Sequence, residues 1–510
     1  MNRKVKNLRL HTDSKTLLGF LLFIVCVLFS FFIFHGLPLS LDDYGFLGTS
    51  FSSNSEALHW VLGYGNGRLF GNGGIIFLLH HRPLDTLVRA MMIAGIAILL
   101  PVSLRVDLLP GSMFAMFLII KITPGIFGQA FSWMSGFQNY VPPVFLFLSG
   151  TWLVQHTGRT GRAGAVLCSL VAAVVGMAMQ LYIEHSSCLN LGMSVLLTFA
   201  AWKKHEGLPY RVSASCFSSG ALLGFVLMLL ITGRSTVGHV SYLSGGLPGL
   251  MYGISRNAIE IISMFSENVV LILCFSVLVL FNLRRFHNSF KAWETRAVLC
   301  GLFLPAAIFC FRAFEGTFSW YGKLIPAETV LTVVAMLLWS VSLFYVLIRL
   351  SRVNSSRRIH NCLALCILAI AGLVPLLFIW PIGYRCLFHS YILMCAGALL
   401  LLDELMAGLK SEQQKRFLVK GICCLLCISV ITLISLFTDI RKMARIREDH
   451  ITEMARSGAE TVEFFNIPSP YIHEVWNEDS EHYAVVDGRK IRLKILPADV
   501  WFRRNYYHFS

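Results

Sequence analysis

Two adjacent carboxylates, Asp42 and Asp43, follow the first strongly hydrophobic run of the sequence by only a few residues. A carboxylate at the centre of a bilayer costs about 2.5 to 3.5 kcal/mol, so such a pair is expected to lie in water or in a polar cavity. There it can act as a general base, as a ligand of a divalent cation, or as an acceptor of hydrogen bonds from sugar hydroxyls. The alternative is that the two charges only end a hydrophobic run.

A second group of polar and aromatic residues lies where later hydrophobic runs end. Trp133 and Tyr140 are typical of a membrane interface, whereas Asn139 between them offers the amide groups that bind hydroxyls. Glu184 is either a helix cap, a contact to an acceptor sugar, or a metal ligand together with the acidic pair. In the last case Mg²⁺ or Mn²⁺ would be the ion.

Three arginines, Arg234, Arg312 and Arg385, lie beside hydrophobic runs on the same predicted side of the membrane. A guanidinium group stays charged and donates hydrogen bonds in a fork that fits phosphate. The alternative is that each extends toward lipid headgroups. We expect at least one of them to bind a phosphate group.

The composition identifies a multi-pass membrane protein. Of 510 residues, 56% are hydrophobic and 14% are charged, compared with about 25% charged residues in soluble proteins. The net charge of +15 comes from cations placed between hydrophobic runs, as the positive-inside rule requires, so nucleic acid is not an expected partner. Most of the 14 Cys lie inside these runs and are interpreted as small apolar residues.

The hydrophobic runs predict an all-α protein with about thirteen transmembrane helices. They lie near 17–38, 86–105, 110–125, 141–155, 163–181, 188–202, 212–231, 264–282, 297–311, 325–349, 361–380, 386–403 and 417–437. The first run has no cleavage signal and is expected to anchor the chain in the plasma (inner) membrane with the N-terminus in the cytoplasm. Arg and Lys then gather in the cytoplasmic connections, while the acidic loop at 39–85 and the other candidate site residues fall outside.

After Phe437 the composition becomes polar, which predicts two domains, a transmembrane domain at 1–437 and a small extracytoplasmic cap at 438–510. Apolar residues between Ile440 and Met454 recur at helical spacing and predict a helix across the membrane face. A β-hairpin is predicted to join 483–486 to 489–495 through Asp487-Gly488. Such a cap is too small to fold readily alone and is expected to pack on the membrane domain.

Several short motifs resemble those of the GT-C superfamily of membrane glycosyltransferases, most closely a bacterial branch akin to serotype-converting glucosyltransferases. These motifs are Leu41-Asp-Asp-Tyr, Trp60 with Asn66-Gly-Arg68, Trp133-x-x-Gly-x-x-Asn-Tyr140, Glu184, and Gly383-Tyr-Arg385. The resemblance implies a GT-C-like fold in the membrane. It also implies inverting transfer of a sugar from a polyprenyl-phosphate donor to a cell-surface glycan or lipid-linked acceptor.

The resemblance further implies a role for each matched residue. Asp42 or Asp43, with Asp43 slightly favoured, would deprotonate the acceptor hydroxyl, a contribution of about 10²- to 10⁴-fold. Arg385, with Arg312 or Arg234, would neutralise the departing phosphate. The acceptor or sugar would contact Glu184, Trp133, Asn139, Tyr140 and Arg68. A metal between Asp43 and Glu184 is left open.

Two other functions fit parts of the pattern. A flippase or transporter of lipid-linked sugars would use the same arginines but would also place functional charge near the bilayer midplane, where this sequence has almost none. A ligase or polymerase of surface polysaccharide would have its working loop late in the chain, whereas the acidic loop here comes first. A purely structural scaffold leaves the clustered acids and arginines unexplained.

Overall fold

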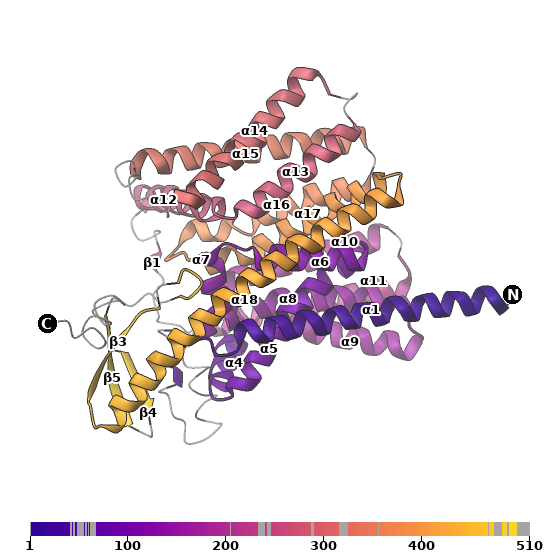
Figure 1. The fold of residues 1–510 in the computed structure, drawn as a ribbon. Coiled ribbons are helices and arrows are strands. Elements are labelled where there is room, and N and C mark those ends of the chain that lie inside the picture. The colour runs from indigo at the N-terminus through magenta and orange to yellow at the C-terminus, as the bar shows by residue number, and fades with distance from the viewer. Residues whose placement is uncertain are drawn as a thin grey trace. The chain divides into compact units, whose positions relative to one another are not determined.

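The computed structural model is mostly helical, and its contacts define two compact units that are described separately (Figure 1). It describes residues 2–40, 43, 46–47, 56, 59, 61, 68–204, 206–232, 240–241, 246–286, 290–315, 325–354, 356–467, 469–473, 482–486 and 489–496. The first unit comprises Met1–Phe23, Ile96–Thr123 and Gly238–Ser429. The second unit comprises Ile24–Gly95, Pro124–Val237 and Val430–Ser510.

The described residues form the following helices. In chain order they are α1 (Asn2–Phe34), α4 (Leu69–Leu79), α5 (Arg82–Leu104), α6 (Leu108–Ile120), α7 (Pro124–Ile126), the π-helix η1 (Phe127–Ser132), α8 (Met134–Thr157), α9 (Arg162–Ala178), α10 (Glu184–Lys203), α11 (Leu208–Thr232), α12 (Gly246–Ser266), α13 (Val269–Arg285), α14 (Ala292–Glu315), α15 (Ile325–Val353), α16 (Arg357–Ala371), the 3-10 helices η4 (Val374–Phe378) and η5 (Tyr384–Leu387), α17 (Phe388–Gly408) and α18 (Glu412–Arg456).

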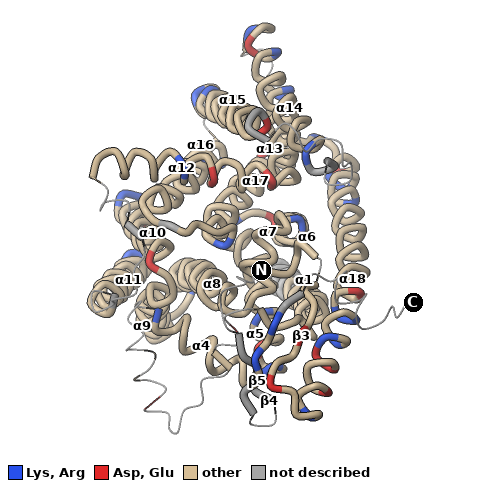
Figure 2. Tube along the Cα trace, turned by 90° about the vertical axis from the view of Figure 1, so that its left-hand side faces the viewer, with Lys and Arg blue, Asp and Glu red and all other residues tan. Residues whose placement is uncertain are grey.

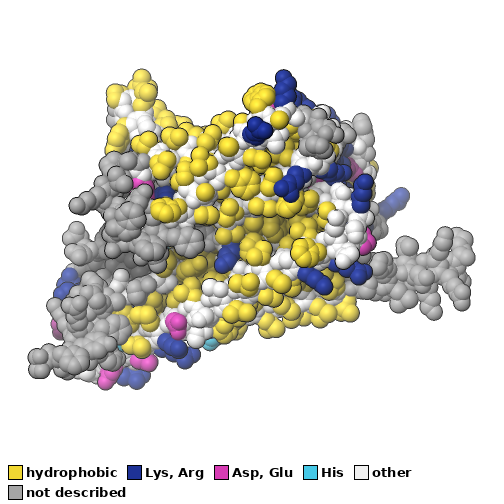
Figure 3. Space-filling view, turned by 45° about the horizontal axis from the view of Figure 1, so that its top comes forward, with side chains coloured by type: hydrophobic (Ala, Val, Ile, Leu, Met, Phe, Trp, Pro, Cys, Tyr) yellow, Lys and Arg dark blue, Asp and Glu magenta, His cyan; other side chains and the backbone are white. Residues whose placement is uncertain are grey.

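Each of the thirteen predicted runs overlaps a helix, but the predicted count of thirteen spans is not confirmed. Within the described residues, eight helices are long and apolar enough to cross a membrane, or up to ten if two bent pairs each form one span. α9 has only 17 residues, and the amides and hydroxyls of α8 and α10 lower their hydropathy. The protein is therefore a multi-pass helical membrane protein. Hydrophobic side chains accordingly dominate the described part of the face seen in Figure 3.

In the second unit, α9 and α11 pack with their backbones in contact. A Cβ atom on Gly220 would lie 2.0 Å from the carbonyl oxygen of Ala173, and one on Gly224 would lie 2.3 Å from that of Met177. Small residues allow such close approach of membrane helices, where packing rather than hydrophobicity drives association. Hydroxyl groups join α10 to α11, because Ser218 Oγ donates to the Ser194 carbonyl oxygen at 2.7 Å.

The C-terminal region differs from the prediction in one respect. The last hydrophobic run and the amphipathic stretch after Phe437 form one helix, α18, because no Gly or Pro interrupts residues 422–456. Figure 2 shows acidic and basic residues gathered on its C-terminal part. The predicted helix across the membrane face is therefore a continuation of the last predicted run. The proposed domain boundary at 437 does not coincide with a helix end.

A three-stranded sheet follows α18. The predicted hairpin is confirmed, since β4 (His482–Val486) pairs antiparallel with β5 (Arg489–Leu496) in the register Val486↔Arg489. β3 (Thr461–Phe465) pairs parallel with β5, which places β5 in the centre. The end of α18 covers this sheet through a small core. Its buried members are Ile451, Ala455, Val462, Phe464, Ile491 and Leu493.

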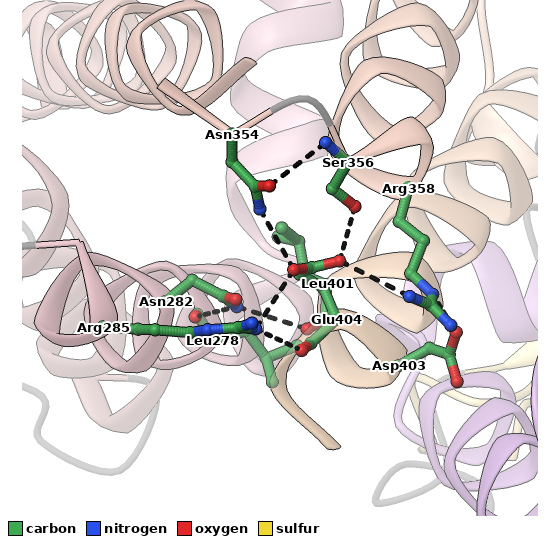
Figure 4. A network of polar contacts seen from close by, with 9 residues as sticks. All are labelled: Leu278, Asn282, Arg285, Asn354, Ser356, Arg358, Leu401, Asp403 and Glu404. Carbon is green, nitrogen blue, oxygen red and sulfur yellow. Dashed lines mark hydrogen bonds and ion pairs between the residues drawn. The ribbon is translucent and has the colours of Figure 1, made fainter. Parts of the chain in front are cut away.

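In the first unit, a buried carboxylate joins three segments that are far apart in the sequence (Figure 4). Glu404, on α17, is 4% exposed and accepts hydrogen bonds from Arg285 Nη1 at 3.2 Å, Asn354 Nδ2 at 3.1 Å and Ser356 Oγ at 2.5 Å. Arg358, on α16, pairs with the neighbouring Asp403 and lies 3.7 Å from Glu404. These contacts hold α13, α16 and α17 together with the segment that follows α15. The same unit contains a two-residue ladder between β1 (Val240–Ser241) and β2 (Ile379–Trp380).

Candidate functional site

Asp43, in the second unit, is buried against the beginning of α8 and is 1% exposed. Its Oδ1 accepts hydrogen bonds from the backbone N–H of Ser135 at 3.1 Å and from Ser135 Oγ at 2.9 Å. Its Oδ2 accepts from the N–H groups of Ser40 at 3.1 Å and of Met134 at 3.4 Å. An ionised carboxylate has about four lone-pair sites, so these four donors occupy all of them.

The segment around Asp43 is held by apolar contacts and by arginines from distant elements. Leu39, Phe46 and Leu47 pack against a cluster formed by α4 and the first residue of α8. Arg82 donates to the Leu37 carbonyl oxygen at 2.7 Å, and the fully buried Arg447 of α18 donates to that of Leu39 at 3.2 Å. The position of Asp43 is therefore set by the surrounding structure.

Arg89, on α5, is 2% exposed and contacts the junction between the end of η1 and the beginning of α8. Its Nε donates to Asp85 Oδ1 at 2.7 Å, one helical turn away. Its Nη1 donates to the carbonyl oxygens of Phe131 and Ser132 at 2.7 and 2.9 Å, at the end of η1. A cation thus meets the C-terminal end of η1 while the Asp43 carboxylate meets the N-terminal end of α8. Both placements are favourable for helix dipoles.

Burial raises the pKa of Asp43 from its ordinary value of 3.8 to about 6. Loss of hydration disfavours the charged carboxylate, and this effect exceeds the opposing contributions of Ser40, Ser135 and Arg89. Between about pH 4 and 6 the folded protein therefore binds a proton at Asp43 that the unfolded chain has released.

The contribution of Asp43 to stability is expected to be largest below about pH 4 and to fall as pH rises through about 6, because the folded state binds the extra proton. Relative to Asp43→Asn, which does not titrate, the wild type should lose up to about 3 kcal/mol of stability over this interval. Thermal unfolding of both proteins in detergent between pH 3.5 and 7.5 measures the difference. A difference that stays constant with pH would contradict the raised pKa.

α4 lies against α8 through glycines that face amide side chains. Asn139 is 6% exposed, and its Nδ2 donates to the Ser135 carbonyl oxygen at 2.8 Å. A Cβ atom on Gly71 would lie 2.2 Å from Asn139 Oδ1, and one on Gly74 would lie 2.9 Å from Gln138 Oε1. These glycines leave the room that the two amides occupy.

Gly71→Ala is expected to lower the free energy of unfolding by about 1 to 3 kcal/mol, because the new methyl group overlaps Asn139 in a filled interior. Gly73→Ala is the matched control. A Cβ atom there meets nothing within 4 Å, and Ala gains up to about 1 kcal/mol over Gly in a helix. The two variants are compared by thermal unfolding in detergent. Equal stability of both would show that α4 does not pack as described.

Arg68 and Glu184 form a two-pronged ion pair at the start of α10. Arg68 Nε donates to Glu184 Oε1 at 3.2 Å, and Nη2 donates to Oε2 at 3.1 Å. The two side chains are 21% and 33% exposed, so solvent screens part of the attraction. A backbone hydrogen bond from Phe70 to the Leu181 carbonyl oxygen at 3.0 Å joins the same two segments.

The aromatic candidates lie on either side of Asn139 along the chain, and both are 8% exposed. Trp133, in the non-helical turn before α8, lies with its ring 4.9 Å from that of His473. The ring of Tyr140 lies 5.5 Å from that of His185, which follows Glu184. Six predicted site residues thus lie in the second unit, where Asp43 and Asn139 both contact Ser135, Arg68 contacts Glu184, Tyr140 contacts His185 and Trp133 contacts His473. They are Asp43, Arg68, Trp133, Asn139, Tyr140 and Glu184.

Two of the arginines predicted to bind phosphate, Arg312 and Arg385, lie in the first unit. Arg312 lies on α14 in the first unit, where its Nε donates to Glu328 Oε1 at 2.9 Å. Arg385 is half-buried in η5 of the same unit, beside Tyr384, whose hydroxyl donates to Glu267 Oε1 at 2.6 Å. The remaining predictions lie outside the described residues. They are Asp42 and Arg234, together with Trp60 and Asn66 of the motifs.

The two carboxylates predicted to share a metal do not fit a divalent cation in this geometry. Asp43 accepts hydrogen bonds from four donors, and both oxygens of Glu184 accept from Arg68. Among the residues that the structure describes, no three His, Cys, Asp or Glu side chains form a metal-binding group. No step below therefore passes through a metal.

Sequence reasoning missed Arg89, Asp85, Ser135 and Arg447. A usable pattern existed for the first two, because an Asp and an Arg four residues apart inside a hydrophobic run form a pair on one helix face. Ser135 and Arg447 act through contacts with residues 92 and 408 positions away. Such contacts leave no local pattern in a single sequence.

No protein-family model, curated protein or solved structure matches this chain. What the fold itself defines is the class of multi-pass helical membrane proteins.

Proposed function

We propose that this protein is an inverting membrane glycosyltransferase that moves a sugar from a polyprenyl-phosphate donor to a cell-surface glycan or lipid-linked acceptor. In this proposal the second unit presents its polar site on the extracytoplasmic side of the plasma membrane. The observation that carries the proposal is that the second unit holds six predicted site residues, among them the Arg68–Glu184 pair and the contacts of Asp43 and Asn139 with Ser135.

The hydrogen bonds of Asp43 favour a positioning role for this carboxylate. All lone pairs of Asp43 accept hydrogen bonds from the α8 junction and Ser40, so Asp43 is better suited to positioning the loop than to removing a proton. We therefore assign the base to Asp42. It takes the proton of the acceptor hydroxyl, and that oxygen attacks the anomeric carbon. The bond from carbon to the phosphate oxygen breaks, and the phosphate leaves with the electron pair, which inverts the configuration.

The other residues of the second unit suit an uncharged, hydroxyl-rich substrate. Glu184 and Arg68 together present a partly exposed carboxylate and guanidinium, while Asn139 adds an amide and Trp133 and Tyr140 add aromatic surfaces. Carboxylates, amides and guanidinium groups all form hydrogen bonds with sugar hydroxyls. We assign these five residues to the acceptor or the transferred sugar.

A lipid-linked donor is supported by two features of the first unit. Arg312 and Arg385 are guanidinium groups of the kind that binds phosphate, and Arg312 also pairs with Glu328. An apolar cavity of about 310 Å³ in the same unit is lined by side chains of α12, α15, α16 and α17, among them Phe265, Trp339 and Leu343. Such a lining suits a hydrocarbon chain.

The test is mass spectrometry of surface glycans from the native host after deletion of the gene and after complementation with variants. We expect deletion to remove one sugar from a glycan. Asp42→Asn should fail to restore it at a normal protein level and an unchanged unfolding temperature. Asp43→Asn should lower both the unfolding temperature and the amount of product. Asp439→Asn, in which a 70% exposed carboxylate of α18 is replaced, should restore the sugar fully.

Two results would overturn the assignment. If deletion leaves every surface glycan unchanged, the protein is not a transferase of that envelope. If deletion removes a sugar but Asp42→Asn and Asp43→Asn both restore it, the carboxylates take no part in chemistry, and a flippase or transporter of lipid-linked sugars becomes the better explanation.

A further inference from the structure

Gln180 and Asn190 are two fully buried amides in the interior of the second unit. Gln180 follows α9, Asn190 lies on α10, and both are 0% exposed. All four of their side-chain polar atoms, Gln180 Oε1 and Nε2 and Asn190 Oδ1 and Nδ2, lack a hydrogen-bond partner among the described residues. An amide buried without a hydrogen-bond partner costs about 1 to 3 kcal/mol by mutational data. We therefore expect these two side chains to be hydrogen-bonded to a bound ligand.

The two amides lie at the same level of the helix bundle. Ser187, one turn before Asn190 on the same face of α10, donates through Oγ to the Gln180 backbone carbonyl oxygen at 2.7 Å. Ser218 Oγ of α11 donates to the carbonyl oxygen of Ser194, which lies one turn beyond Asn190 on α10. A Cβ atom on Gly224 would lie 3.0 Å from the Cβ of Gln180. The Gln180 side chain therefore starts beside Gly224 of α11.

The polar contacts between α10 and α11 continue up to this level. Thr198 Oγ1 donates to the Ala214 carbonyl oxygen at 2.8 Å and lies 2.7 Å from Ser218 Oγ, one turn beyond Ser194. Each of these hydroxyls has a partner on the facing helix. At Asn190, one turn earlier on α10 than Ser194, the side-chain amide has no hydrogen-bond partner among the described residues.

We propose that Gln180 and Asn190 form an enclosed binding site for ordered water between α9, α10 and α11. The chemistry of the site selects its ligand, because neutral amides present donors and acceptors but no charge. The complete burial of both side chains restricts the ligand to a small molecule. Ordered internal water typically makes about three hydrogen bonds to such groups. The site lies about 9 Å along α10 from Glu184, at 1.5 Å per residue.

Bound water here would complete the polar contacts that orient the first turns of α10, which carry Glu184 and His185. This inference does not depend on the proposed transferase activity, because it concerns only the packing of three helices. It also explains why two amides are tolerated among apolar helices that are otherwise joined by hydroxyls and glycines.

The test is X-ray radiolytic footprinting of the full-length protein in lipid nanodiscs, in which hydroxyl radicals formed from bound water oxidise neighbouring side chains. Met179 and Met193 are the reporters, since they adjoin Gln180 and follow Asn190 by one turn, and they are 0% and 5% exposed. Met116 of α6, which is 3% exposed, is the internal reference. We expect Met179 or Met193 to be oxidised several-fold faster than Met116.

The double variant Gln180→Leu/Asn190→Leu should fold, because replacing buried polar groups by apolar groups of similar shape is close to neutral. It should slow oxidation of Met179 and Met193 to the rate of Met116. Asn282→Leu is the matched control: Asn282 is an equally buried amide, but its Nδ2 donates to the carbonyl oxygens of Leu278 and Leu401. That control should leave the rates at both reporters unchanged. Wild-type rates at Met179 and Met193 no higher than at Met116 would overturn the proposal, even if the double variant failed to fold.

Discussion

Arg89→Met is expected to lower the free energy of unfolding by about 3 to 5 kcal/mol, the usual cost of removing one partner from a buried ion pair. The substitution keeps most of the side-chain volume but leaves Asp85, whose side chain is 7% exposed, without its cation. It also removes the donor to the carbonyl oxygens of Phe131 and Ser132 at the end of η1. Thermal unfolding in detergent measures the loss. The yield of folded protein after solubilisation should fall together with the unfolding temperature.

Arg445→Met is the matched control for Arg89. Arg445 lies exposed on α18 in the same unit, and substitutions at exposed positions usually change stability by less than about 0.5 kcal/mol. A further variant, Asp85→Leu/Arg89→Met, removes both charges and should recover part of the lost stability. If Arg89→Met were as stable as Arg445→Met, Arg89 would not hold the η1–α8 junction.

Glu404→Leu is expected to cost a similar amount, about 3 to 5 kcal/mol, in the first unit. Its side chain is only 5% exposed, and its loss leaves Arg285, Asn354 and Ser356 without their shared acceptor (Figure 4). Because Glu404 on α17 joins α13 to the residues just before α16, the substitution should loosen α13, α16 and α17 together. Hydrogen exchange of the backbone amides near the ends of these helices should therefore increase in parallel.

Glu412→Leu serves as the control for Glu404. The Glu412 side chain is 75% exposed and pairs with Lys415 three residues away, an arrangement that contributes little. We expect no measurable change in hydrogen exchange at α13, α16 or α17. A similar effect of both substitutions would mean that the Glu404 network does not join these helices.

The sequence was sufficient for features that depend on local patterns. Hydrophobic runs located every one of the thirteen predicted helical segments, and Asp487-Gly488 between two alternating segments located the hairpin of β4 and β5. The number of spans could not be obtained in this way. The hydropathy of α8 and α10 is lowered by amides and hydroxyls that packing buries inside the second unit.

The sequence predicts members of a candidate site but not the contacts that these residues make. Asp43, Asn139 and Glu184 were selected because polar groups next to a hydrophobic run are costly to keep near hydrocarbon unless they serve a function. Their geometry depends on Ser135, Arg89 and Arg68, which approach them from other parts of the chain. The four hydrogen bonds to Asp43 assign the two adjacent carboxylates different roles in our proposal, although neighbouring Asp residues look equivalent in a sequence.

The contact between Gly71 and Asn139 also limits how this sequence can diverge. The two positions share one volume, so a larger residue at position 71 requires a smaller one at position 139, and the same holds for Gly74 and Gln138. In relatives of this protein we therefore expect these two pairs to covary. A lineage in which position 71 acquires a side chain would have exchanged the amide at 139 at nearly the same time, and with it one contact of the proposed sugar site. Packing of a short helix would in this way constrain the evolution of substrate preference.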